Sequence, residues 1–194
     1  MNEILFYITH YGILLIQLLI IFLILKFIFS STVKNFHSRW STLIDDFNFS
    51  SEDFYNLLKE ELESNEIKGI ITSFVFLKEG GAFSSRRTYL RLMWKDFHYD
   101  ICAAPFGKGF FISWWLLYKN SLGQIIVSKI PFIGGWLASK LYPVTYYKID
   151  VASMFMSYAQ SSVLKVIDTI TKEKGIRGLS EAERKPILQD IFKR

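Results

Sequence analysis

The longest feature of the hydrophobic pattern is an unbroken apolar run from Ile4 to Phe29. Its 26 residues exceed the roughly 20 that an α-helix needs to cross a hydrocarbon core about 30 Å thick. The run has neither the basic amino-terminal region nor the small-residue cleavage site of a signal peptide. It therefore predicts a single N-terminal transmembrane helix within residues 1–30.

The charges that flank the run give this helix an orientation. No Lys or Arg precedes it, whereas Lys26, Lys34 and Arg39 lie near or beyond its end. Because positive residues gather on the cytoplasmic side, we expect the amino terminus outside and the C-terminal domain in the cytoplasm. In this interpretation the chain is an integral membrane protein with the lipid bilayer as a partner, and residues 31–49 are a juxtamembrane linker.

An amphipathic helix is predicted for the segment SEDFYNLLKEELESN, with Ser50 or Ser51 as its N-cap. Its apolar residues share one helical face, at Phe54, Leu57, Leu58 and Leu62. Acidic residues cover the other face, which is typical of a solvated surface.

Two more helices are predicted near the carboxyl terminus. Asp150 is a suitable N-cap for a long helix with apolar residues at helical spacing, and Gly175 ends it. Ser180 and Glu183 then have the spacing of a capping box and predict a final helix, which Pro186 kinks or restarts.

Between Gly69 and Lys119 the period changes to about two, which predicts four strands in an antiparallel meander. A hairpin that turns at Lys95 and Asp96 fixes the register of the second and third strands. One face then carries the apolar pairs Trp94 with Phe97, Leu92 with Tyr99 and Leu90 with Ile101. The other face carries Met93 with His98, Arg91 with Asp100 and Tyr89 with Cys102. The predicted fold of residues 50–194 is thus a two-layer α+β domain, with a roughly four-stranded antiparallel sheet packed by helices.

Residues 121–142 allow three interpretations. They are long and apolar, but Lys129, Pro131 and a pair of glycines interrupt them. We expect an interfacial or re-entrant segment, in which Trp136, Lys129 and Lys140 contact the membrane. Buried soluble helices and a second membrane span are the alternatives.

Charge is distributed unevenly along the chain. Residues 45–66 hold eight acids against Lys59 alone, a net of −7, and residues 67–194 hold 19 basic against 9 acidic residues, a net of +10. A basic body is attracted to anionic headgroups or other anions. Nucleic-acid binding is not favoured, because no RNP, zinc-finger or helix-turn-helix signature is present.

The only grouping with chemical character lies on the polar face of the predicted hairpin. Asp96, His98, Asp100 and Cys102 alternate along one strand, where side chains two residues apart are roughly 7 Å from each other. That spacing is wide for ligands of one metal ion, and an arginine across the hairpin offers Asp100 a salt bridge. We therefore predict no metal and no cofactor.

These observations favour a binding module over an enzyme. The predicted function is a membrane-anchored module that recognises an anionic lipid, a small ligand or a protein partner, with Arg86, Arg87, Arg91 and Lys108 as its anionic contacts. One alternative is a membrane-proximal enzyme that uses Asp96, His98 and Asp100 as acid, base and orienting groups. The other is a homo-oligomer that perturbs the membrane.

Overall fold

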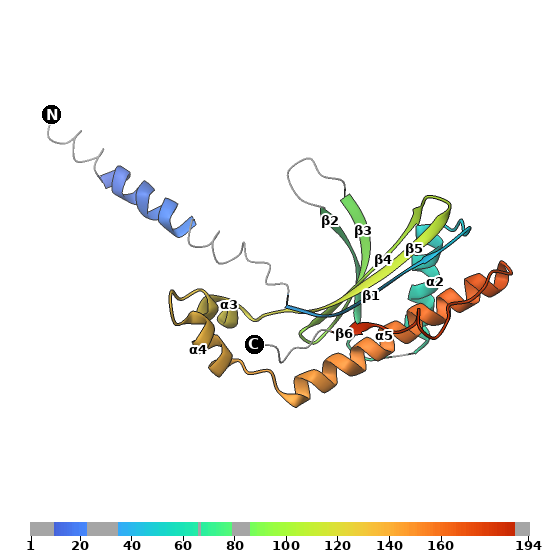
Figure 1. Ribbon diagram of the computed structural model, residues 1–194. Coiled ribbons are helices and arrows are strands. Elements are labelled where there is room, and N and C mark those ends of the chain that lie inside the picture. The colour runs from blue at the N-terminus through green and yellow to red at the C-terminus, as the bar shows by residue number, and fades with distance from the viewer. Residues whose placement is uncertain (1–9, 23–34, 66, 79–85, 189–194) are drawn as a thin grey trace. The chain divides into compact units, whose positions relative to one another are not determined.

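The computed structural model describes residues 10–22, 35–65, 67–78 and 86–188 (Figure 1). The chain forms two compact units, one made of residues 1–33 and 120–143 and the other of residues 34–119 and 144–194. The second unit contains the sheet and is described first.

A single antiparallel sheet of six strands, in the order β2-β3-β4-β5-β1-β6, forms the centre of this unit. The strands are β1 (Asn35–Ile44), β2 (Ile71–Lys78), β3 (Arg86–Trp94), β4 (Phe97–Phe106), β5 (Gly109–Tyr118) and β6 (Ile187–Leu188). The α+β class and the antiparallel meander of β2 to β5 agree with the sequence pattern. The sequence pattern predicted too few strands, because β1 and β6 also belong to the sheet.

The register predicted for the central hairpin is confirmed. Trp94 pairs with Phe97, Leu92 with Tyr99, Leu90 with Ile101 and Arg91 with Asp100. Lys95 occupies the turn with a positive φ of 53°, the conformation that a tight two-residue hairpin requires. One register keeps all apolar pairs on the core face, so any slip would place apolar side chains in water.

Strand β1 lies within the range that was predicted as a linker, residues 31–49. Its core-facing residues include Ser38 and Thr42 beside Trp40 and Ile44, so the apolar alternation in its sequence is weak. Pairing with β5 along its whole length compensates for this weak local signal.

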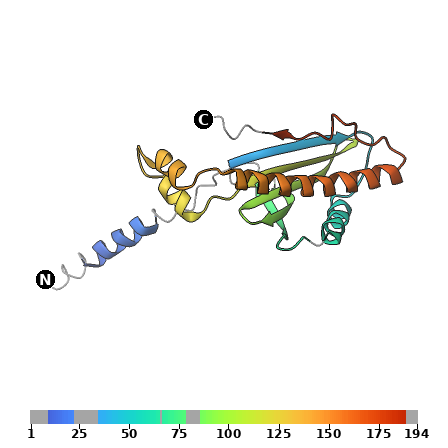
Figure 2. The same ribbon diagram turned by 90° about the horizontal axis from the view of Figure 1, so that it is seen from below.

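Two helices, α2 (Ser51–Ser64) and α5 (Tyr146–Glu173), cover one face of the sheet, and α5 runs along its length (Figure 2). Ser50 caps α2 as predicted, because its side chain accepts from the Asp53 amide. Helix α5 starts earlier than predicted: Thr145 is its N-cap, and Asp150 lies within the first turns. Gly175, with a φ of 66°, follows the end of α5 as expected.

The core between helices and sheet is dominated by aromatic side chains. Tyr99 and Trp114 stack at 4.7 Å between ring centroids, and the Phe155 ring of α5 lies 6.0 Å from that of Tyr99. The Tyr99 hydroxyl and the Trp114 indole nitrogen are buried there, and neither has a hydrogen-bond partner among the residues that the structure describes. The hydroxyl of Tyr55 on α2, in contrast, has a partner, because it accepts a hydrogen bond from the Ala103 amide at 2.9 Å.

The final predicted helix does not form. Ser180 and Glu183 make the reciprocal capping-box hydrogen bonds, but only one turn follows before the chain extends at Pro186 into β6. Pairing of β6 with Ser38 and Arg39 of β1 takes the place of further helical turns.

The unit made of residues 1–33 and 120–143 contains the segment that was predicted to span a membrane. Residues 10–22 are helical and exposed. Across the described residues, we find no helix that combines the length and apolar character of a membrane span. This finding contradicts the predicted transmembrane anchor of residues 1–30, and with it the integral membrane location from which the orientation of the chain was inferred. Residues 4–9 and 23–29 of the apolar run lie outside the described residues.

Residues 121–142 form two short helices, α3 (Leu122–Ser128) and α4 (Gly134–Leu141), on either side of Pro131. Gly134 allows the two helices to approach closely, because a Cβ there would lie 2.7 Å from the Val127 carbonyl oxygen. Neither of these two helices, of 7 and 8 residues, has the length of a membrane span. The side chains of Trp136 and Lys140 are exposed on α4, and Lys129 is the C-cap of α3.

Candidate functional site

The face of the sheet opposite α2 and α5 carries the polar groups that the sequence singled out. We call it the outer face. Within the described residues no helix covers it, since the contacts of both helices in this unit lead to the other face. Its members are Arg39, Ser41 and Leu43 on β1, Arg87, Tyr89, Arg91 and Met93 on β3, His98, Asp100 and Cys102 on β4, and Phe111, Ser113, Trp115 and Leu117 on β5.

An ion pair between Arg91 and Asp100 lies at the centre of this face. Both carboxylate oxygens accept from the guanidinium, at 2.6 Å from Nε and 2.7 Å from Nη2. The Asp100 side chain is only 2% exposed, whereas that of Arg91 is 21% exposed. Hydrogen bonding to Asp100 raises the pKa of Arg91, so the guanidinium stays charged. The salt bridge that was predicted between Asp100 and an arginine across the hairpin is therefore present.

The same register row continues across the sheet. Asp100 is opposite Trp115 on β5, and Trp115 is opposite Arg39 on β1. The guanidinium carbon of Arg39 lies 5.8 Å from the centre of the Trp115 ring, within the range of a cation–π interaction. A cation, an aromatic ring and an ion pair thus follow one another over four adjacent strands.

Cys102 is a buried neighbour of this row. Burial has the largest effect on the Cys102 thiol and raises its pKa, whereas the charge of Arg87 and hydrogen bonds from Arg87 and Tyr89 lower it. A thiol in this state is protonated near neutral pH and is a poor nucleophile or metal ligand. Among the described residues, no group of three His, Cys, Asp or Glu side chains could hold a metal ion.

The three residues proposed as acid, base and orienting group have different surroundings. Asp96 lies in the turn between β3 and β4, where its backbone carbonyl accepts from the Lys119 amide at 2.7 Å. His98 is half-buried, and burial followed by the charge of Arg91 lowers its pKa. Both oxygens of Asp100 are already bonded to Arg91. This arrangement explains a stable sheet face better than it explains proton transfer.

The four predicted ligand contacts do not converge on one point. Arg87 and Arg91 share the outer face but are four residues apart, which is about 13 Å along a strand. Arg86 is exposed at the start of β3, and Lys108 is exposed in the turn between β4 and β5. A single small anion could not contact all four residues, and Arg87 and Arg91 are the two of them that share the outer face.

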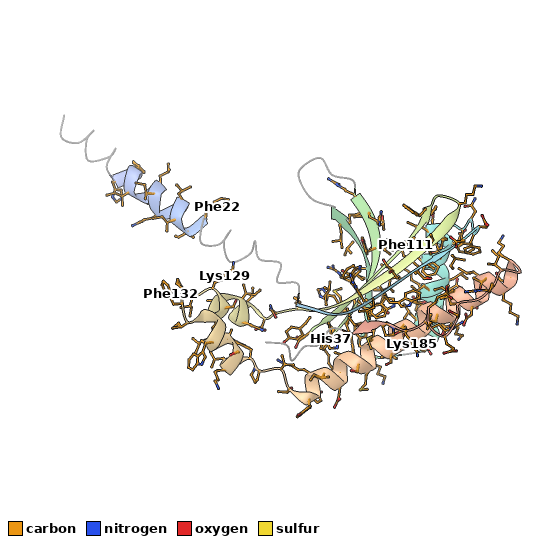
Figure 3. All side chains as sticks on the ribbon, in the orientation of Figure 1. Phe22, His37, Phe111, Lys129, Phe132 and Lys185 are labelled. Carbon is orange, nitrogen blue, oxygen red and sulfur yellow. The ribbon has the colours of Figure 1, made fainter. Side chains whose placement is uncertain are left out.

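Sequence reasoning missed two members of the row formed by Arg91, Asp100, Trp115 and Arg39. Arg39 was placed in a linker because β1 was not predicted, and Trp115 was treated only as part of an apolar strand. The alternation of Arg39, Ser41 and Leu43 with core residues was the available signal. Figure 3 shows His37 and Phe111 on the sheet that carries this surface.

A groove of about 380 Å³ lies away from the outer face, along α5. Asp168 and Arg184 line it, and their carboxylate and guanidinium form a two-bonded ion pair at 3.0 and 2.5 Å. Lys165, which also lines the groove, pairs with Glu61 of α2 at 2.7 Å. Most of its charged groups are thus already neutralised within the chain.

Comparison with known proteins identifies no family for this chain. No family model matches it, and no curated protein matches it. One solved structure, a crystal structure of the protein TTHA0849 from Thermus thermophilus, aligns with 66% of this chain and 97% of its own length at 18% identity and a TM-score of 0.23. A similarity this weak assigns neither a fold family nor a function.

Proposed function

We propose that this chain is a binding module that recognises a partner protein with an acidic surface through the outer face of its sheet. The observation that carries the proposal is the row formed by Arg91, Asp100, Trp115 and Arg39 across four adjacent strands, on the sheet face that no helix of the described residues covers.

The residue types on this face are those that dominate protein interfaces. Trp, Tyr and Arg are enriched among the residues that contribute most to binding, and Trp115, Tyr89 and Arg39 are all present. Trp115 remains 37% exposed and Leu43 41% exposed, so both have apolar area that a partner can still bury.

Charge supports an acidic partner. The outer face carries the three guanidinium groups of Arg39, Arg87 and Arg91 and, among its members, the one carboxylate of Asp100. Its described side chains therefore have an excess of positive charge. A broad surface also suits a macromolecule better than a small ligand, because small ligands are bound in concave sites that enclose most of their surface.

Catalysis receives less support from the same residues. Burial raises the pKa of the Cys102 thiol, and Asp100 is held by Arg91. His98, with its lowered pKa, is opposite Met93 on β3 and Leu117 on β5, and neither of these neighbours is a nucleophile that it could activate. The binding role uses the observed geometry without rearranging this ion pair.

Site-specific photo-crosslinking in cells tests the proposal. We expect a photoreactive residue at Ser41, on the outer face, to capture a defined partner, and one at Thr169, exposed on α5, to capture none or a different set. The captured protein is then purified, and its affinity for the full-length chain is measured by calorimetry.

Substitution separates a specific interface from adventitious capture. We expect Arg39→Gln or Trp115→Ala to weaken this affinity by about tenfold or more, and added salt to slow association. Trp136→Ala is the matched control, because Trp136 is 64% exposed but belongs to the other unit. Equal capture at Ser41 and Thr169, or an affinity that is indifferent to Arg39, Trp115 and salt, refutes the proposal.

A further inference from the structure

The two edges of the sheet differ in how far they are covered by the chain itself. At one side the chain covers its own edge strand: β6 pairs with Ser38 and Arg39 of β1, and the Trp40 indole donates to the Glu183 carbonyl. At the other side β2 is the last strand, and among the described residues it pairs only with β3. Every second residue of such an edge strand directs its N–H and C=O away from the sheet.

Strand β2 is apolar on both faces and open to solvent. Phe74 is 43% and Phe76 67% exposed on the helix side, while Ile71 is 61% and Leu77 39% exposed on the outer side. Edge strands normally carry charges, prolines or bulges that prevent pairing with other chains. Over its eight residues β2 has one charged residue, Lys78 at its end, and no proline.

Charge distinguishes the two ends of this edge. Arg86 and Arg87, both exposed, lie opposite Lys78 and Leu77 at the carboxyl end of β2. Residues at the amino end are uncharged, since Ile71 is opposite Met93 and Thr72 is opposite Leu92. Positive charge on β2 and on the facing residues Arg86 and Arg87 of β3 is therefore concentrated at the carboxyl end of β2.

We propose that the β2 edge binds an extended peptide segment of a partner protein by strand addition. The segment runs antiparallel to β2, as the neighbouring strands do, and has apolar residues at alternate positions that cover Phe74 and Phe76. Asp or Glu at its amino end lies beside Lys78 of β2, with Arg86 and Arg87 one strand further away, and is attracted by all three charges. This site is distinct from the outer face, because backbone hydrogen bonds supply the affinity and the alternate side chains supply the specificity.

A second copy of the chain fits this edge less well. Helix α2 lies directly beneath β2, since the Tyr55 ring is 5.5 Å from that of Phe74 and the Lys59 ammonium is 4.2 Å from its centre. Pairing of β2 with the β2 of another copy, at the usual spacing of about 4.8 Å between strands, would bring two α2 helices together. Residues 45–66 carry a net charge of −7, so these helices repel each other.

The binding assay uses the full-length chain and the fluorescently labelled peptide DEVTVTVT, whose acidic amino end matches the cationic end of β2. We expect saturable binding by fluorescence anisotropy. N-methylation of the peptide backbone at alternate residues should abolish it, because it removes the amide hydrogens that an added strand donates. Replacing the two acidic residues by Ser, or Arg86→Gln in the protein, should weaken binding at least about threefold and reduce its salt dependence.

Matched substitutions locate the site. Phe76→Lys should weaken binding at least about tenfold, whereas Phe106→Lys, at an equally exposed position on β4 (68% against 67%), should leave it unchanged. Trp115→Ala should also leave it unchanged, so this proposal and the outer-face proposal fail separately. No saturable binding up to millimolar peptide, unchanged binding of the N-methylated peptide, or a dimer that Phe76→Lys converts to monomer would each overturn strand addition by a partner peptide.

Discussion

Removal of either partner of the Arg91–Asp100 pair should destabilise the protein, and removal of Arg91 should cost more. Loss of one partner of a buried ion pair typically costs about 3–5 kcal/mol, because the remaining charge is left without compensation. Asp100 is 2% exposed, so Arg91→Ala leaves a buried carboxylate and should cost about 3–4 kcal/mol. Arg91 is 21% exposed and can reach water, so Asp100→Ala should cost only about 2 kcal/mol.

Urea unfolding of the full-length chain, followed by tryptophan fluorescence, measures these differences. The double substitution Arg91→Met with Asp100→Leu should restore stability to within about 1 kcal/mol of the parent, because two apolar side chains replace both charges. Arg177→Ala is the control: this arginine pairs with Glu183 but is 78% exposed, and its loss should cost less than about 0.5 kcal/mol. A smaller cost for Arg91→Ala than for Asp100→Ala would refute the reasoning from burial.

Three further substitutions test the core and the titrating groups. Tyr99→Phe should raise the free energy of unfolding by about 1 kcal/mol, because it removes a buried hydroxyl that lacks a partner; a loss of stability would show that this hydroxyl is bonded. Tyr55→Phe should instead cost about 1–3 kcal/mol, since it leaves the Ala103 amide unpaired, and an unchanged urea midpoint would contradict that bond. Burial and Arg91 lower the pKa of His98 below 6.5, so the unfolded chain takes up more protons and stability should fall as the pH decreases through 6.5 to that lowered pKa. Urea midpoints of His98→Gln should vary less with pH in this window, and a profile parallel to the parent would exclude the contribution of His98.

The accuracy of the sequence predictions followed the strength of the local pattern. The β3–β4 register was predictable because all of its core pairs are apolar, and a one-residue slip would exchange the two faces. Strand β1 was not predictable in this way, since Ser38 and Thr42 occupy core positions and long-range pairing with β5 stabilises it.

The errors in the helices have physical reasons as well. Ser180 and Glu183 form a capping box, but Pro186 cannot donate a helical hydrogen bond and the chain pairs with β1 instead. The apolar run of residues 4–29 has the length and hydropathy that a membrane-spanning helix needs. The described helix of residues 10–22 does not meet this requirement for a membrane span.

The candidate site was predictable in part. Arg91 and Asp100 were correctly placed opposite each other, because both belong to a hairpin with a clear register. Arg39 and Trp115 meet only after β1 has paired with β5, a contact between residues 76 positions apart that no local periodicity reveals. The proposed binding surface therefore depends on the strand pairing that the sequence indicated least clearly.

The short strand β6 limits the stoichiometry of any association through sheet edges. The chain's own strand β6 occupies part of the β1 edge, so the described part of each molecule has one full-length free edge, at β2. A peptide strand added at this edge would therefore give a discrete one-to-one complex, not a growing fibril. Truncation before Pro186 would uncover the β1 side and give each molecule two docking edges, the minimum for linear polymerisation.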